Sequence, residues 1–356
     1  MRVMQLIDSL QPGGAERMAV SLANELSLII NKSFLCSTRE EGLLLDTINE
    51  RVSYIYLKKK GILDLRAFRR LYTFISTNNI DIIHAHSSSF FIATVIKMFK
   101  PKIKIIWHDH YGYRKNENIK KHRVLRLCSK KFYSIITVSE DLMTWAEKHL
   151  KAKKVFFLNN FVSQSTVLKR EVFLHGHEEF RIICLANLRS QKDHLILLKA
   201  FRLVKSQCNL ASLHLVGEIH NDTYHKSLRS FIRDNDLEDV YFYGVQKDTF
   251  GLMKDAKIGV LSSMSEGLPV ALLEYGLANL PVVCTDVGQC KEVINNHGLV
   301  VSSGNAERLA QALMVYIDNP RKRNEDALAY SKHIRSKYTF EAVQSKLLTL
   351  YKSQKY

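Results

Sequence analysis

The feature that most constrains the fold is a regular alternation of short apolar runs and helical patterns along a chain of 356 residues. Each apolar run is followed by a longer segment in which apolar residues recur every three or four positions. This alternation is typical of the α/β class, in which helices cover both faces of a parallel sheet. In the first half, strands are expected at 3–7, 34–37, 52–57, 80–85, 103–107, 135–138 and 155–158, and helices at 63–75, 90–99, 119–132 and 141–150.

The alternation is interrupted once, by a polar stretch near the middle of the chain, and then begins again. A chain of this length is too long for a single domain with one hydrophobic core of ordinary size, and it is long enough for two domains. We therefore expect an N-terminal domain at 1–165, a linker at 166–179, a C-terminal domain at 180–335 and a final helical segment at 336–356. In the second series, strands are expected at 181–185, 212–216, 240–243 and 258–261, and helices at 193–204, 224–233, 249–254, 306–316, 323–334 and 340–351.

Composition narrows the class of protein further. Hydrophobic residues make up 46% of the chain, which is a globular value, and no segment has the roughly eighteen consecutive apolar residues that a membrane span requires. The start of the chain favours a strand over a signal peptide, because Asp8 interrupts its apolar run. The six cysteines lack the spacing of metal ligands, and Cys184 and Cys284 fall in apolar runs. Free thiols in a reducing cytoplasm are therefore expected.

Positive charge is concentrated in the first half of the chain. Residues 1–178 carry 29 Lys and Arg against 16 Asp and Glu, whereas residues 179–356 carry 23 against 19. Such a field favours a polyanion or an anionic lipid surface as a partner, and general solubility is the alternative explanation. No nucleic-acid-binding motif and no basic platform with interleaved aromatic residues accompanies the charge, so nucleic acid is not expected as a partner.

The stretch 265–283, SEGLPVALLEYGLANLPVV, carries the strongest indication of a ligand site. It follows an expected strand, and Pro269 suits the first turn of a helix that runs to about residue 279. Backbone amides such as those of Gly267 and Leu268, together with the positive end of a helix dipole, can bind a phosphate group.

Two carboxylates lie beside this expected anion site. Glu266 and Glu274 cannot bind the phosphate themselves, so we expect them to accept hydrogen bonds from hydroxyl groups of the same ligand. In this interpretation Glu274 would bind a ribose and Glu266 a sugar. The alternative is structural: Glu266 would favour the helix start electrostatically, and Glu274 would be a solvated helix residue.

At these residues the sequence resembles the retaining glycosyltransferases of family 4, which have the GT-B fold of two Rossmann-like domains facing each other across a cleft. The shared pattern is E-G-x-P-x-x-x-x-E followed by G-x-P-V-V, with Asn279 in place of the usual glycine. The resemblance extends over nearly the whole chain. It implies transfer of a sugar from a nucleotide diphosphate, most commonly uridine diphosphate, without a cofactor and without a metal ion.

The resemblance also implies roles for residues around the expected anion site. Arg189 and Lys192 would stabilise the negative charge of the departing diphosphate. Cations at the start of a helix are mildly unfavourable with the helix dipole, which favours this functional role over a purely structural one. Many family members have arginine where Asn187 stands. Asn187 is itself still expected among the substrate-binding residues, together with Pro269. Gly217 would allow a close backbone approach at the end of its strand, and Val245 would lie near the base.

In the first half, the resemblance implies residues on the reacting side of the cleft. The loop that contains Gly13, Gly14 and Glu16 would approach the substrates, although a glycine pair by itself indicates only a turn. His110, or His108 close beside it, would lie near the reacting sugar and the acceptor.

Two patterns suggest metal binding, and each has a stronger counter-argument. His84 and His86 end one expected strand, and His108 and His110 with Asp109 end the next, but ligands that would complete a metal motif are missing. A D-x-D sequence at 234–236 resembles the manganese site of other glycosyltransferases. It closes a surface-type helix, however, and is expected to form a turn. No metal site is therefore predicted.

The sequence thus predicts a retaining glycosyltransferase that acts on a saccharide or lipid-linked acceptor in the synthesis of cell-surface polysaccharide. The alternatives are a non-catalytic protein that binds a sugar nucleotide at the membrane, and another GT-B activity such as a nucleotide-sugar epimerase. A cytoplasmic protein, peripheral on the inner face of the membrane, is expected. The candidate membrane contacts are Met98, Phe99 and Trp107 near Lys97, Lys100, Lys102 and Lys104.

Overall fold

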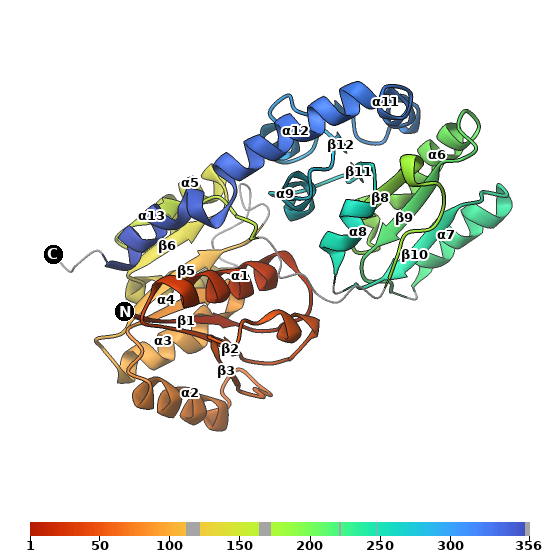
Figure 1. Cartoon of the computed structure of the whole chain (residues 1–356). Helices are drawn as coiled ribbons and strands as arrows, with labels where there is room; N and C mark the ends of the chain where they lie inside the picture. Colours follow the sequence, from red (N-terminus) through yellow and green to blue (C-terminus); the bar gives the residue numbers. More distant parts are fainter. Residues whose placement is uncertain (112–121, 164–171, 221, 247, 353–356) are drawn as a thin grey trace. The chain divides into compact units, whose positions relative to one another are not determined.

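The computed structural model describes residues 1–111, 122–163, 172–220, 222–246 and 248–352, and the chain divides into two compact units (Figure 1). Unit 1 contains Met1–Ser163 together with Phe340–Tyr356, and unit 2 contains Gln164–Thr339. Residues 166–171 of the expected linker lie outside the described residues. The linker's last two positions begin the 3-10 turn η5, Glu178–Phe180.

Unit 1 is built on a parallel sheet of seven strands in the order β3-β2-β1-β4-β5-β6-β7. The order reverses between β1 and β4, which pair with each other. In open sheets of this kind, ligands bind beyond the carboxyl ends of the strands at such a reversal. The strands are β1 Arg2–Ile7, β2 Lys32–Ser37, β3 Ser53–Tyr56, β4 Ile82–His86, β5 Lys104–Asp109, β6 Ser134–Thr137 and β7 Val155–Phe157.

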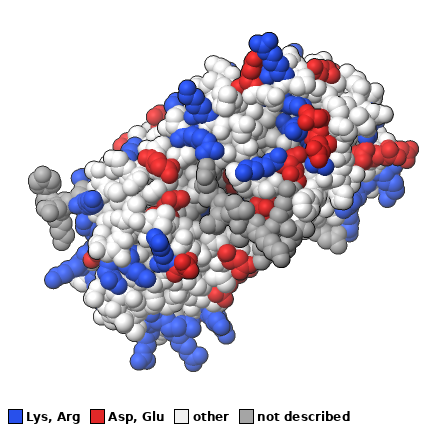
Figure 2. Space-filling model, viewed as in Figure 1, with Lys and Arg blue, Asp and Glu red and all other residues white. Residues whose placement is uncertain are grey.

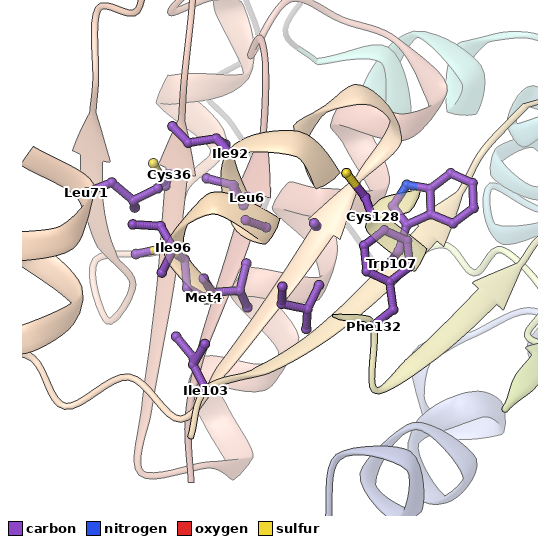
Figure 3. Close-up of a cluster of buried hydrophobic side chains, with 14 of the residues drawn as sticks. Met4, Leu6, Cys36, Leu71, Ile92, Ile96, Ile103, Trp107, Cys128 and Phe132 are labelled. Carbon is purple, nitrogen blue, oxygen red and sulfur yellow. The ribbon is translucent and has the colours of Figure 1, made fainter. Parts of the chain in front are cut away.

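One face of this sheet packs against α2, α3, α4 and α5. Side chains at alternate positions of β1 and β5, among them Met4, Leu6 and Trp107, form the core on this side (Figure 3). Trp107 is only 1% exposed and its indole N–H donates to the carbonyl oxygen of Ser87. The expectation that Trp107 contacts a membrane is therefore wrong. The helices are α2 Leu65–Thr77, α3 Phe90–Phe99, α4 Arg123–Cys128 and α5 Glu140–His149.

The other face of the sheet packs against α1, Gly14–Ile29, and against the last helix of the chain, α13, Phe340–Lys352. Leu347, Leu350 and Tyr351 of α13 are buried in one cluster with Val3 of β1 and Ile106 of β5. Because α13 follows unit 2 in the sequence, the chain returns to unit 1 at its end.

Unit 2 contains a second parallel sheet, in the order β10-β9-β8-β11-β12-β13. Its strands are β8 Arg181–Leu185, β9 Ser212–Val216, β10 Val240–Gly244, β11 Ile258–Leu261, β12 Val282–Thr285 and β13 Leu299–Val301. Its helices are α6 His194–Lys205, α7 Thr223–Asp234, α8 Thr249–Asp255, α9 Val270–Leu277, α10 Cys290–Ile294, α11 Ala306–Asp318 and α12 Pro320–Lys337. The α/β class predicted from the sequence is confirmed in both units. The short elements α10 and β13 were not predicted.

Two local expectations differ from the structure, and the structure explains one departure from the family pattern. Helix α9 begins at Val270, and Pro269 is its N-cap in an extended conformation rather than a first-turn residue. Asn279 has a φ of 59°, a left-handed conformation that asparagine tolerates better than most residues. This explains how Asn279 can replace the glycine of the family pattern. The helix expected at 119–132 ends earlier, because α4 stops at Cys128 and gives way to a 3-10 turn at Ser129–Lys131; positions 119–121 lie outside the described residues.

No helix within the described residues combines the length and the apolar character needed to cross a membrane.

The contribution of α13 to unit 1 can be measured by replacing Leu347, which is fully buried, with alanine. We expect Leu347→Ala to lower the free energy of unfolding by about 2–5 kcal/mol, because it removes buried methyl groups and leaves a cavity. Both tryptophans, Trp107 and Trp145, belong to unit 1, so urea unfolding followed by tryptophan fluorescence reports on that unit. The matched control is Leu328→Ala, because Leu328 is 68% exposed. Equal midpoints for the two variants would contradict the packing of α13.

Candidate functional site

The candidate donor site in unit 2 lies where two neighbouring parallel strands end. Strands β8 and β11 pair with each other, so the segments that follow them leave the sheet at the same edge. The first segment contains the sequence from Ala186 to Asp193, and the second runs from Ser262 to Pro269. Met264 N–H donates to Gln191 O at 2.9 Å, and Gln191 Nε2 donates to Ser265 O at 2.9 Å. Backbone and side-chain bonds thus join the two loops.

The centre of the site is an ion pair between Lys192 and Glu266. Lys192 Nζ lies 2.5 Å from Glu266 Oε1, and Ser263 Oγ donates to the same oxygen at 2.6 Å. The Glu266 side chain is 8% exposed and that of Lys192 is 24% exposed. An ammonium group has three protons, so Lys192 can hold Glu266 and still donate to a ligand.

The loop that contains Glu266 is also held by the segment after β12. Gly288 has a φ of 54°, and a Cβ atom there would lie 2.1 Å from the carbonyl oxygen of Glu266. Gln289 N–H donates to Gly267 O at 3.0 Å. Only glycine at position 288 allows this approach, so the carbonyl groups of the loop face the β12 segment.

The start of α9 supplies hydrogen-bond donors at the same place. The amides of Gly267 and Leu268 make no hydrogen bond among the described residues, and the helix begins two residues after Leu268. The first amides of any helix lack intrahelical partners, and the helix dipole adds partial positive charge there. The arrangement can bind an anion beside the Glu266 and Lys192 pair.

The other residues expected on the donor side differ in burial and in hydrogen bonding. Asn187 Oδ1 accepts from the backbone N–H of Glu218 at 3.0 Å, which gives Asn187 a structural role. Arg189 is exposed, and its guanidinium has no partner within the described parts of the chain. Glu274 is half-buried in the second turn of α9. Val245 is half-buried just after β10.

Gly217 lies in close contact with the backbone of a neighbouring loop, as its position at the end of a strand suggested. It has a φ of 154°, and a Cβ atom there would lie 2.2 Å from the carbonyl oxygen of Ala186. The end of β9 thus packs directly against the loop that carries Asn187. The sequence did not single out Ser263, the second donor to Glu266, because a serine two residues after a strand is common in loops.

A second candidate site, in unit 1, is a cluster of four histidines at the ends of β4 and β5. His86 and His108 are partners in the parallel register. His84 Nε2 lies 3.2 Å from His108 Nδ1, and His86 Nδ1 lies 2.8 Å from His110 Nε2. The rings of His108 and His110 have their centroids 4.0 Å apart. The cluster thus consists of two hydrogen-bonded pairs in contact with each other.

Burial keeps these histidines neutral. It lowers the pKa of His84 and of His110 to about 3, and for His84 the neighbouring His110 adds to the effect. Burial also holds the pKa of His86 and of His108 well below the usual range. His108 is 1% exposed, whereas His110 is half-buried, so His110 is the more accessible of the two histidines predicted for the site.

Ring nitrogens of His84, His86 and His108 lie within 4.8 Å of one another, close enough to be considered as ligands for a cation. A shared metal ion requires lone pairs that converge on one point. Here His84 Nε2 faces His108, and His86 Nδ1 faces His110, in two separate hydrogen bonds. The arrangement is that of a hydrogen-bonded network.

The glycine loop before α1 has a structural explanation. Gly13 is the N-cap of α1, and a Cβ atom on it would lie 2.3 Å from Glu16 Oε2. The carboxylate of Glu16 therefore folds back over Gly13, where it is favourable with the helix dipole. Gly14 has open space around its α-carbon.

The close approach at Gly288 can be tested against a glycine with similar backbone strain. Gly304 has a φ of 74°, and a Cβ atom on it would have no other atom within 4 Å, so Gly304→Ala measures strain alone. We expect Gly304→Ala to cost about 1 kcal/mol of unfolding free energy. Gly288→Ala should cost clearly more, because the Glu266 loop must move, and urea denaturation would measure both. Equal losses would contradict the tight packing of this loop.

Comparison with known proteins places this geometry in a family. A family model described as Glycosyltransferase Family 4 matches residues 12–165, and one described as Glycosyl transferases group 1 matches residues 179–319. An uncharacterized glycosyltransferase from Haemophilus influenzae is 24% identical over 323 residues, which cover 86% of this chain and 88% of that protein.

Two further similarities concern a shorter segment and the fold. The N,N'-diacetylbacillosaminyl-diphospho-undecaprenol alpha-1,3-N-acetylgalactosaminyltransferase of Campylobacter jejuni is 30% identical over 104 residues, which cover 27% of this chain and 28% of that protein. The crystal structure of Anabaena Alr3699/HepE in complex with UDP and glucose superimposes with a TM-score of 0.80 at 18% identity, and covers 99% of this chain and 100% of that one. The two family matches together span most of the chain, which therefore belongs to the glycosyltransferases of family 4 and has their GT-B fold.

Proposed function

We propose that the protein transfers a sugar, with retention of configuration, from a nucleoside diphosphate donor to a hydroxyl group of a lipid-linked saccharide in the synthesis of cell-surface polysaccharide. The donor base is uracil in this proposal. The Anabaena protein of the same fold was crystallised with UDP, and the name of the Campylobacter relative specifies a diphospho-undecaprenol-linked acceptor. Both facts support the proposal by similarity.

The observation that carries the proposal is the ion pair of Lys192 and Glu266 beside the start of α9. As the glycosidic bond breaks, the departing diphosphate gains negative charge, and fixed cations and N–H donors stabilise it. Lys192, the exposed Arg189 and the amides of Gly267 and Leu268 would perform this role. No metal ion is needed to supply the charge in this scheme.

The environment of Glu266 favours a hydrogen-bonding role for its carboxylate. One of its oxygens already accepts from both Lys192 and Ser263. A carboxylate engaged in this way is a poor nucleophile, so we propose that Glu266 binds the donor sugar. The acceptor would then attack from the face that the diphosphate leaves, and the diphosphate would take its proton.

Unit 1 would supply the acceptor side of the reaction. His110, with His108 behind it and the loop of Gly13 and Gly14, would lie near the reacting hydroxyl group. The low pKa of His110 supports this role, because a neutral imidazole can accept a hydrogen bond from a hydroxyl group.

Donor binding can be tested with a panel of nucleotide sugars in the absence of divalent metals. A ligand at a hundred times its Kd stabilises the folded protein by about 2.7 kcal/mol, so a specific donor should raise the melting temperature. We expect Arg189→Ala and Glu274→Ala to weaken the affinity for that donor about tenfold or more, since each removes a charge-assisted hydrogen bond.

The matched controls for this experiment are Lys226→Ala and Glu238→Ala, because both side chains are exposed elsewhere in unit 2. They should leave the affinity unchanged. A protein that binds no donor, with or without magnesium or manganese, would argue against the transferase proposal. A donor that is bound but never transferred or converted would favour a non-catalytic protein, and free epimerised donor would favour an epimerase.

We further propose that unit 1 binds an anionic membrane surface peripherally, on the cytoplasmic face. Met98 and Phe99 at the end of α3 are more than half exposed, as are Ile62, Leu63 and Leu65 before and at the start of α2. The rings of Phe68 in α2 and Phe99 lie 5.3 Å apart, so the two apolar groups adjoin. Lys and Arg side chains gather over the α2 end of unit 1 in Figure 2, and those exposed near these residues are Lys58, Lys60, Arg66, Arg69 and Lys102.

Vesicle sedimentation tests this second proposal. We expect binding to vesicles that contain phosphatidylglycerol, weaker binding to phosphatidylcholine alone, and a loss of binding as salt is raised, because surface charges are screened. Leu63→Ser with Leu65→Ser should weaken binding, whereas Leu328→Ser, at a similarly exposed leucine of unit 2, should not. Binding that is absent, or indifferent to salt, would remove the membrane proposal.

A further inference from the structure

A buried glutamine in the first strand has no explanation in the packing of the core. Gln5 lies in β1 and is fully buried, on the same side of the strand as Val3 and Ile7. Burying an amide group without hydrogen bonds costs free energy, so such residues are expected to have polar partners. The partner here is His86, whose Nε2 lies 2.9 Å from Gln5 Oε1.

The direction of this hydrogen bond determines where protons lie in the first histidine pair. A carbonyl oxygen can only accept, so His86 Nε2 must carry the hydrogen. Since a neutral imidazole has one N–H, Nδ1 of His86 has a lone pair and accepts from His110 Nε2 at 2.8 Å. His110 Nδ1 is then left with a lone pair, and it has no hydrogen-bond partner among the described residues.

We propose that Gln5 is a positioning residue that fixes, through His86, the tautomer in which His110 presents an unprotonated Nδ1 to the substrate. A hydroxyl group of the acceptor or of the donor sugar would donate its hydrogen bond to that nitrogen. The inference rests on the proposed function for the part of His110 in the reaction. The tautomer itself is a property of unit 1 alone.

The second histidine pair is oriented by a different residue. Tyr351 of α13 forms a 2.7 Å hydrogen bond with His84 Nδ1, and His84 in turn bonds to His108. Burial raises the pKa of Tyr351. Gln5 Nε2 is buried and makes no hydrogen bond within the described residues, so the Gln5 amide contacts the first pair through its oxygen alone.

The tautomer can be observed directly by NMR of protein labelled with 15N-histidine. Two-bond and three-bond correlations distinguish a protonated ring nitrogen from an unprotonated one, and the spectrum of His110→Ala identifies the His110 signals among those of the 14 histidines. We expect His110 to be neutral, with the hydrogen on Nε2. A hydrogen on Nδ1 in the unsubstituted protein would overturn the proposal without any reference to activity.

Substitutions of Gln5 test its role. Gln5→Met removes the acceptor at similar volume, so we expect His110 to populate both tautomers and kcat to fall about tenfold or more, with KM for the donor little changed. Gln5→Glu keeps an oxygen acceptor toward His86 and should restore the Nε2–H tautomer of His110. An unchanged tautomer and kcat in Gln5→Met would refute the positioning role.

Tyr351→Phe is the matched control, because it breaks the hydrogen bond to the other pair. It should leave the His110 tautomer unchanged, and an equal change in Tyr351→Phe and Gln5→Met would overturn the assignment to Gln5. If the NMR result holds but no donor or acceptor gives turnover, the proposed function fails and the tautomer assignment stands.

Discussion

The ion pair of Lys192 and Glu266 is the interaction on which the candidate donor site depends. It joins the loops after β8 and β11, which a parallel sheet places side by side. Because Glu266 is mostly buried, loss of Lys192 would leave a carboxylate without its counter-charge, which is strongly unfavourable. The serine and glutamine hydrogen bonds around the pair fix both loops before any ligand arrives. Preorganised charges of this kind stabilise a transition state without reorganising during the reaction.

Unit 1 uses the same sheet geometry for a different purpose. Side chains alternate across a strand, so Val3, Ile82 and Ile106 lie on the face that packs against α1 and α13. The histidines and Gln5 continue that face toward the carboxyl ends of the strands. Tyr351 contacts His84 from α13, and the end of the chain therefore contributes to the polar cluster as well as to the core. Truncation of α13 would expose both.

The sequence predicted the α/β class and the order of most elements because short apolar runs and helical periodicity are local signals. It also indicated that Glu266 and Lys192 belong to one site, since both follow strands expected at one sheet edge. The position of Pro269 as an N-cap was not predictable, because its φ suits both the N-cap and the first helical turn. The replacement of the family glycine by Asn279 is explained only by the positive φ of this residue in the structure.

The histidine network depends on contacts that no local pattern contains. The two H-x-H patterns predicted polar groups at neighbouring strand ends, but the pairing of His84 with His108 and of His86 with His110 depends on strand register. Gln5 could have been noticed as a polar residue in an apolar strand, in phase with Val3 and Ile7. Its contact with His86, 81 positions away, and that of Tyr351 with His84 are set only by the tertiary fold.

A crystal structure of the protein with bound UDP would test the role of the ion pair without any assumption about the acceptor. We expect the diphosphate to lie within hydrogen-bonding distance of Lys192 Nζ and of the amides of Gly267 and Leu268, with a ribose hydroxyl group on Glu274. A diphosphate bound away from the start of α9, with Lys192 making no contact to it, would show that the donor site lies elsewhere.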